Sequence, residues 1–292
     1  TRTDIYFAFT PLHLRIISCL PRKSSSVLVV LNTKDLSEYV KSYIDEEKFH
    51  SVYILKKKYF SLIDLLKLNY NHKYINSVFV GNYKFINFRL INLFIRYKNL
   101  ITFDDGIGSV TGSYFHLESK FYKEKLYGLL NINIERIFKK HRKHISIYKN
   151  NQNRNLANIQ YLDIKKIDKE FPFSGNVLIT TDKSEVGTMS QLDELNLFKK
   201  IIQNYKISNV IHHPAKRYNI DLENVHIINM AFLSEDIIMN SNFDNVYTLS
   251  ASTVLGLENF GYFPIEKVTY LANRTAENFK QFENNSDVNL IA

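Results

Sequence analysis

The sequence contains a single cysteine, Cys19. One thiol cannot form a disulfide within the chain, and it supplies no cluster of thiolates for a structural metal. The cysteine content therefore fits a protein of a reducing cytosol.

Long apolar segments are also missing. No uninterrupted apolar run is long enough to span a bilayer, and residues 1–4 lack the charged-then-apolar pattern of a secretory signal. We therefore expect a cytoplasmic protein, whose contact with the inner face of the plasma membrane would be peripheral.

The third absence is an RNA-binding signature, although the formal net charge is +9. The lysines fall in small groups, at residues 56–58, 139–143 and 165–166, and no glycine-aromatic motif lies between them. Solvated surface explains each group most simply, and a patch for an anionic membrane is the next interpretation. A basic nucleic-acid-binding protein is the least favoured alternative.

The pattern along the chain alternates strands and helices, which is typical of open parallel sheets with right-handed crossovers. With 292 residues and 45% hydrophobic content, the chain can form two cores of ordinary domain size. We predict an α/β fold of two doubly wound, Rossmann-type halves facing each other across a cleft. The predicted strands are residues 5–9, 27–31, 51–55, 77–80, 100–103, 176–181, 209–212, 225–228 and 246–249; the predicted helices are 12–20, 35–45, 61–68, 85–97, 121–130, 193–205, 234–239 and 254–260.

A polar stretch at residues 150–155 marks the approach to a domain boundary, which we place between residues 150 and 175. The predicted domains are residues 1–160 and residues 161–292. The two halves share a pattern and no repeated sequence.

Two acids and a glycine, Asp104, Asp105 and Gly106, end the strand at residues 100–103. Ligands of parallel sheets bind beyond the carboxyl ends of the strands, so this position favours a site. Neighbouring side chains of a strand point to opposite faces, so one acid at most faces a given cleft. Taken alone, the pair could equally be a solvated turn.

Polar residues also end two strands of the second half. His213 precedes Pro214, which favours extended geometry, and Lys216 follows them, so that an anion is a plausible ligand. Hydroxyl side chains at residues 250, 252 and 253 stand at a strand-to-helix junction, a setting that suits phosphate. Each feature has an ordinary structural explanation, a hydrogen-bonded turn histidine and a helix N-cap respectively.

Glu235 lies at the start of a predicted helix. A carboxylate there can accept hydrogen bonds from ribose hydroxyls. It can equally interact with the helix dipole or form half of a capping box.

The order of these motifs resembles bacterial sialyltransferases, and most closely glycosyltransferase family 52, which sialylates lipooligosaccharide and capsular glycans. The resemblance covers most of the chain, including the Thr10-Pro11 turn after the first strand. It implies a GT-B architecture and a homodimer. It also implies transfer of sialic acid from CMP-sialic acid to a terminal galactose, with inversion and α-2,3 linkage.

On the acceptor side, the resemblance implies that Asp105 or Asp104 is the general base. In this family an acid of the second domain can take that role instead. Asp182 and Asp193 are therefore rival candidates.

On the donor side, the resemblance implies that a histidine and hydroxyl groups contact the phosphate of CMP and that an acid holds its ribose. The matching residues are His213, with His212 as a competitor, Ser252, Thr253 and, for the ribose, Glu235. Lys216 and Ser250 are further donor-side candidates, because each lies beside one of these motifs.

We expect no metal and no other cofactor. The leaving group carries one phosphate, and a histidine, two hydroxyls and a helix N-terminus can stabilise it. The sequence also contains no acid and histidine cluster with metal-ligand spacing. Another bacterial surface-polymer transferase, such as a polysialic acid polymerase or a polyol-phosphate transferase, is the main alternative function.

Overall fold

The computed structural model divides into two compact units, Thr1–Ile164 and Lys165–Ala292. Within the described residues, no helix is long and apolar enough to cross a membrane. The structure describes residues 2–22, 25–31, 36–55, 71, 74–83, 86–106, 128–129, 134–149, 156, 158–180, 189–212, 224–249, 251–271 and 289–291.

The first unit is built on a seven-stranded sheet with the order β3-β2-β1-β4-β5-β6-β7, in which every neighbouring pair is parallel. The order reverses between β1 and β4, which makes this a doubly wound sheet. The strands are β1 (Thr3–Ala8), β2 (Ser26–Leu31), β3 (Ser51–Leu55), β4 (Ile75–Val80), β5 (Tyr97–Phe103), β6 (His141–Ser146) and β7 (Ile159–Tyr161).

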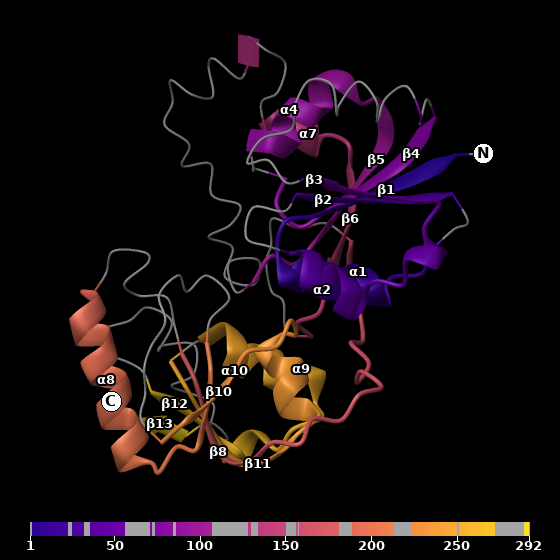
Figure 1. Cartoon of the computed structure of the whole chain (residues 1–292). Coiled ribbons are helices and arrows are strands. Elements are labelled where there is room, and N and C mark those ends of the chain that lie inside the picture. The colour runs from indigo at the N-terminus through magenta and orange to yellow at the C-terminus, as the bar shows by residue number, and fades with distance from the viewer. Residues whose placement is uncertain are drawn as a thin grey trace. The chain divides into compact units, whose positions relative to one another are not determined.

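Helices cover both faces of this sheet, as Figure 1 shows: α1 and α2 lie against one face, and α4 and α7 against the other. The central strands are consequently buried on both faces and read as continuous apolar runs. The core includes Phe7, Phe88 and Leu100, none of which is exposed. The helices are α1 (Pro11–Cys19), α2 (Ser37–Tyr43), the short 3₁₀ helix η1 (Glu46–Lys48), α4 (Ile86–Phe94) and α7 (Ile134–Phe138).

The second unit repeats the design with a six-stranded parallel sheet in the order β10-β9-β8-β11-β12-β13. Its order reverses between β8 and β11, and Leu178, Phe198 and Val210 form part of its core. The elements are β8 (Ser174–Ile179), α8 (Gln191–Asn204), β9 (Asn209–Ile211), β10 (His226–Ile228), α9 (Ser234–Met239), β11 (Asn242–Thr248), α10 (Ala251–Phe260), the 3₁₀ helix η3 (Ile265–Lys267), β12 (Val268–Leu271) and β13 (Asn289–Ile291).

The predicted α/β class with doubly wound sheets is confirmed. The predicted helices at residues 61–68 and 121–130 lie outside the described residues, apart from residues 128–129 at the end of the second. Four strands, β6, β7, β12 and β13, were absent from the prediction. The predicted helix at residues 85–97 ends earlier, at Phe94, because β5 already begins at Tyr97.

Strand β6 was missed because its first half, His141 to Lys143, reads as a basic surface patch. In the structure Arg142 is exposed, while Ile145 and Ser146 are buried between neighbouring strands. The strand thus combines a charged, partly exposed beginning with a buried end, so its sequence does not show the alternation expected of a half-buried strand.

The ends of β5 and β6 are joined by the Asp104 carboxylate, which is fully buried (0% exposed). Its Oδ1 lies 2.8 Å from His144 Nε2, and its Oδ2 accepts hydrogen bonds from Ser146 Oγ at 2.9 Å and from Ile147 N at 2.7 Å. Thr102 Oγ1 lies 2.8 Å from the other ring nitrogen of His144. Because each donor comes from β6 or the residue after it, this carboxylate fixes the end of β5 in register.

Replacement of Asp104 by alanine should therefore lower the free energy of unfolding by about 3–5 kcal/mol, because buried donors lose a charged partner. Urea unfolding followed by circular dichroism measures the change. The control is Asp163→Ala, which removes an exposed aspartate of the same unit. Equal stability of the two variants would contradict a structural role for Asp104.

Candidate functional site

The candidate site of the first unit lies where the strand order reverses, at the carboxyl ends of β1, β4 and β5. Doubly wound sheets bind ligands at this point, since the loops there diverge toward opposite faces. Three side chains meet there, from the first turn of α1, from the residue pair after β4 and from the end of β5: His13, Asn82 and Asp105.

Asp105 accepts two hydrogen bonds at this point. Its Oδ1 lies 2.6 Å from His13 Nε2, and its Oδ2 accepts a hydrogen bond from Asn82 Nδ2 at 3.1 Å. The Asp105 side chain is 16% exposed, whereas the His13 side chain is completely buried. A carboxylate is thus held at the surface of the unit by donors from two other elements.

The local sequence explains why His13 reaches this position. Thr10 caps α1 by accepting a hydrogen bond from the backbone N–H of His13, and Pro11 occupies the start of the helix. His13 is therefore fixed in the first turn of α1, shortly after the end of β1. Its ring packs edge-on against Phe9 and Phe103.

Gly81 provides the space for the His13 ring. A Cβ at residue 81 would lie 2.7 Å from His13 Cε1 and 2.8 Å from Cδ2, which is too close for any side chain. The φ angle of Gly81 is not in the left-handed region. Close approach of the ring, and not backbone conformation, requires glycine here.

Asp104 and Asp105 point to opposite sides, as expected for neighbours at a strand end. Asp104 is surrounded by donors of β6 and contacts no open surface, whereas Asp105 is partly exposed at the switch point. The geometry therefore separates the pair into a structural acid and an accessible one. Both residues were candidates in the sequence, and only Asp105 is placed to meet a ligand.

The second unit places Glu235 in the first turn of α9, beside α10. Its Oε2 accepts a hydrogen bond from Ser234 Oγ at 2.9 Å, and its Oε1 would lie only 2.9 Å from a Cβ at Gly256. Gly256 thus lets the carboxyl group pack against the backbone of α10. Burial of this carboxyl group raises the pKa of Glu235 to about 7.

Helix α10 begins at Ala251, directly after β11, at the point where the order of the second sheet reverses. The sequence predicted that it begins at Val254, with Ser252 or Thr253 as a candidate N-cap. Both residues instead lie inside the first turn, where Thr253 is buried and Ser252 is half-buried. A helix that starts at a switch point directs its first backbone N–H groups toward a bound phosphate.

Two of the remaining candidates from the sequence are described. His212 directly follows β9, and its Nδ1 lies 3.3 Å from Oγ1 of Thr180, which directly follows β8. Asp193 is also described, as an exposed residue whose backbone and side chain are both hydrogen-bonded to Ser190 at the start of α8. The residues that lie outside the described part of the chain are Asp182, His213, Lys216 and Ser250.

His13 and Asn82 were not singled out from the sequence. The Thr10-Pro11 helix start was recognised, and it fixes the position of His13 three residues after the cap. Asn82 follows β4 in a Gly-Asn pair at a strand end, the same kind of signal that identified Asp105.

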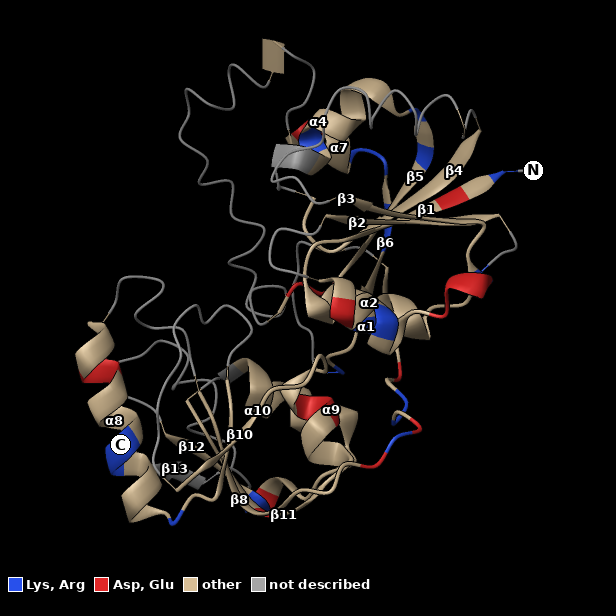
Figure 2. Cartoon of the chain, in the orientation of Figure 1, with Lys and Arg blue, Asp and Glu red and all other residues tan. Residues whose placement is uncertain are grey.

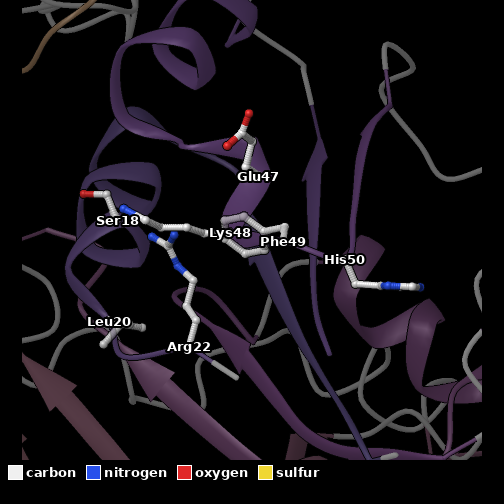
Figure 3. A pocket seen from close by; sticks show the side chains of 7 residues that line it. All are labelled: Ser18, Leu20, Arg22, Glu47, Lys48, Phe49 and His50. Atoms are coloured by element: carbon white, nitrogen blue, oxygen red, sulfur yellow. The ribbon is translucent and has the colours of Figure 1, made fainter. Parts of the chain in front are cut away.

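A pocket of about 600 Å³ lies at the opposite edge of the first sheet, near the amino ends of β2 and β3 (Figure 3). Arg22 donates a hydrogen bond to Ile17 O at 2.9 Å and stacks 4.4 Å from the centre of the Phe49 ring. Lys48 pairs with Asp45 at 3.0 Å. Because its two cations have intramolecular partners and it is remote from the switch point, we do not assign the transfer site to this pocket.

Charged residues are spread over both units in Figure 2, where acidic positions interrupt the basic ones. Within the described residues, no group of three or more histidine, cysteine or acidic side chains is arranged to hold a metal ion.

The raised pKa of Glu235 makes stability depend on pH in a definite direction. An acid that ionises near pH 4.5 when unfolded and near pH 7 when folded stabilises the protein below pH 4.5 and loses this contribution as the pH rises to 7. Glu235→Gln should therefore flatten the fall in unfolding free energy across this interval, measured by urea titrations at several pH values. Glu170→Gln, at an exposed glutamate of the same unit, is the control. An unchanged slope in Glu235→Gln would show that this carboxyl group is not buried in solution.

Comparisons with known proteins agree with this arrangement. The family model described as glycosyltransferase family 52 matches residues 24–272. The N-acetyllactosaminide alpha-2,3-sialyltransferase of Haemophilus influenzae is 23% identical over 206 residues, which are 68% of this chain and 66% of that protein. The chain thus spans slightly less than two thirds of the length of this relative.

The fold is shared with a UDP-GlcNAc 2-epimerase of Methanocaldococcus jannaschii, solved in complex with UDP-GlcNAc and UDP. The two structures align with a TM-score of 0.58 over 100% of this chain and 89% of the other, at 12% identity. The GT-B type of fold predicted from the sequence is therefore confirmed. Because the family model extends across both units and includes β5, α9 and α10, the chain belongs to glycosyltransferase family 52.

Proposed function

We propose that the protein is an inverting sialyltransferase that transfers sialic acid from CMP-sialic acid to a terminal galactose of a bacterial surface glycan, with α-2,3 linkage. The observation that carries the proposal is the Asp105 carboxylate, held at the switch point of the first sheet in a member of family 52. The relative named as an alpha-2,3-sialyltransferase supports the choice of sugar and linkage.

In the proposed reaction, a hydroxyl of galactose attacks C2 of sialic acid while the bond from C2 to the CMP phosphate breaks. The hydroxyl proton passes to a carboxylate on the acceptor side, and CMP leaves with the bonding electrons. General base catalysis of this kind typically contributes about 10²–10⁴-fold to the rate. We assign the base to Asp105, since Asp104 is enclosed by its β6 partners.

The second unit would bind CMP. The first turn of α10, with Ser252 and Thr253, is placed at a switch point and suits the single phosphate. Glu235 lies in the first turn of α9, beside α10, and suits the ribose hydroxyls. We assign His213, Lys216 and Ser250 to the same phosphate. Negative charge on the leaving phosphate is then stabilised by a helix N-terminus and hydrogen-bond donors, without a metal ion.

We also propose a homodimer that contacts the anionic inner face of the plasma membrane. The support for the membrane contact is the net charge of +9 and the exposed cations of α7, β6 and the turn between them, which are Arg136, Arg142 and Lys139. Vesicles containing anionic lipid should bind the protein at low salt and release it at high salt, because such attraction is screened.

The donor can be tested by thermal shift and by transfer assays. CMP should raise the melting temperature more than UDP or GDP does, since a ligand that binds the folded state stabilises it by about 2.7 kcal/mol at 100 times its dissociation constant. Transfer from CMP-sialic acid to a galactose-terminated acceptor should persist in excess EDTA. A strict requirement for manganese, or stabilisation by UDP alone, would contradict the proposal and favour another surface-polymer transferase.

The base can be identified with a pair of variants. Asp105→Asn should lower the turnover number by at least about 100-fold, because the amide cannot accept the proton, and should leave the dissociation constant of CMP unchanged. Asp182→Asn is the matched comparison. If Asp182→Asn abolishes turnover while Asp105→Asn remains active, the base belongs to the second unit.

A further inference from the structure

We propose that His13 and Asn82 are positioning residues, which hold the Asp105 carboxylate in one orientation toward the acceptor hydroxyl. The proposal rests on the proposed function, in which Asp105 meets the acceptor. It adds two residues, from α1 and from the turn after β4, whose effect on transfer passes through Asp105.

The hydrogen bonds of His13 determine its tautomer. Its Nδ1 accepts a hydrogen bond from the backbone N–H of Phe9 at 3.1 Å, so this nitrogen carries no proton. The ring proton is therefore on Nε2, which donates it to Asp105 Oδ1 at 2.6 Å. His13 is a neutral donor in this arrangement. It has no free lone pair on Nε2 with which to take a proton from Asp105.

The His13 ring also has no room to turn. The ring is completely buried, and Phe9 and Phe103 pack edge-on against it. On another side it lies in the space that a side chain at residue 81 would fill. Such a donor is preorganised, because its side-chain entropy was lost on folding and is not lost again when the acceptor binds.

Asn82 fixes the second oxygen of the same carboxylate, at 3.1 Å. Donors on both oxygens define the plane of the carboxylate, and the side chain is still 16% exposed. The neighbouring acid Asp104, directly after β5, is turned toward His144 of β6. The carboxylate is thus both oriented and accessible.

Two substitutions of His13 separate its two hydrogen bonds. The amide of glutamine reaches the place of Nε2 and can donate to Asp105, whereas the carbonyl of asparagine reaches only the place of Nδ1 and can accept from Phe9. His13→Asn should lower kcat/KM for the acceptor by about 10–100-fold, which is typical of a lost hydrogen bond to a charged group. His13→Gln should recover most of that loss, and both variants should bind CMP as the wild type does.

A double-mutant cycle tests whether His13 acts through Asp105. The variant with both His13→Asn and Asp105→Asn should be no slower than Asp105→Asn alone, because the positioned group is already lost. The same result is expected for Asn82→Ala combined with Asp105→Asn. Multiplied losses in the double variants, or equal losses in His13→Asn and His13→Gln, would overturn the proposal.

The tautomer can be read without substrate. In ¹⁵N-labelled wild-type protein, NMR should show His13 protonated at Nε2 only, and the Nε2 proton resonance should move in Asp105→Asn. Protonation at Nδ1 would overturn the proposal even if the His13 variants fail to fold. If the wild type does not transfer sialic acid from CMP-sialic acid, the proposed function fails, while this spectrum still tests the positioning of Asp105.

Discussion

The arrangement of the first unit depends on the buried carboxylate of Asp104. Its hydrogen bonds with His144, Ser146 and the Ile147 amide connect the end of β5 to β6, and both of its oxygens have partners there. Because adjacent side chains of a strand point to opposite sides, fixing Asp104 also fixes the direction of Asp105. The two acids have different roles for this reason: one sets the backbone, and the other receives His13 and Asn82 and remains accessible.

Much of this fold follows from local sequence. Continuous apolar runs such as Val27 to Leu31 indicated strands buried on both faces, and the Thr10-Pro11 pair indicated the start of α1. The two clearest errors of the prediction are the missed strand β6 and the predicted start of α10. β6 begins with basic residues and ends buried, so its charge suggested a surface patch. Helix α10 begins at Ala251, ahead of the predicted start, because β11 ends at Thr248 and leaves little chain for a turn.

The candidate site could be predicted only in part, for a related reason. Asp105, Glu235, Ser252 and Thr253 stand at strand or helix ends, which the sequence pattern locates. His13 contacts Asp105 across 92 positions of the chain. That contact requires the strand order of the sheet, which brings the ends of β1, β4 and β5 together. A single sequence predicts the alternation of strands and helices, but it does not predict which strands become neighbours.

Glycine has the same function at both candidate sites. Gly81 admits the His13 ring in the first unit, and Gly256 admits the Glu235 carboxyl group in the second. Neither residue has a positive φ angle, so a substitution to alanine would meet no backbone strain and would fail by contact alone. In each case the absent side chain lets an ionisable group lie against backbone, where reduced contact with water makes its hydrogen bonds stronger and lets neighbours control its protonation. A glycine that neither turns the chain nor caps a helix is therefore informative. It marks the place where a functional side chain from another element approaches the backbone.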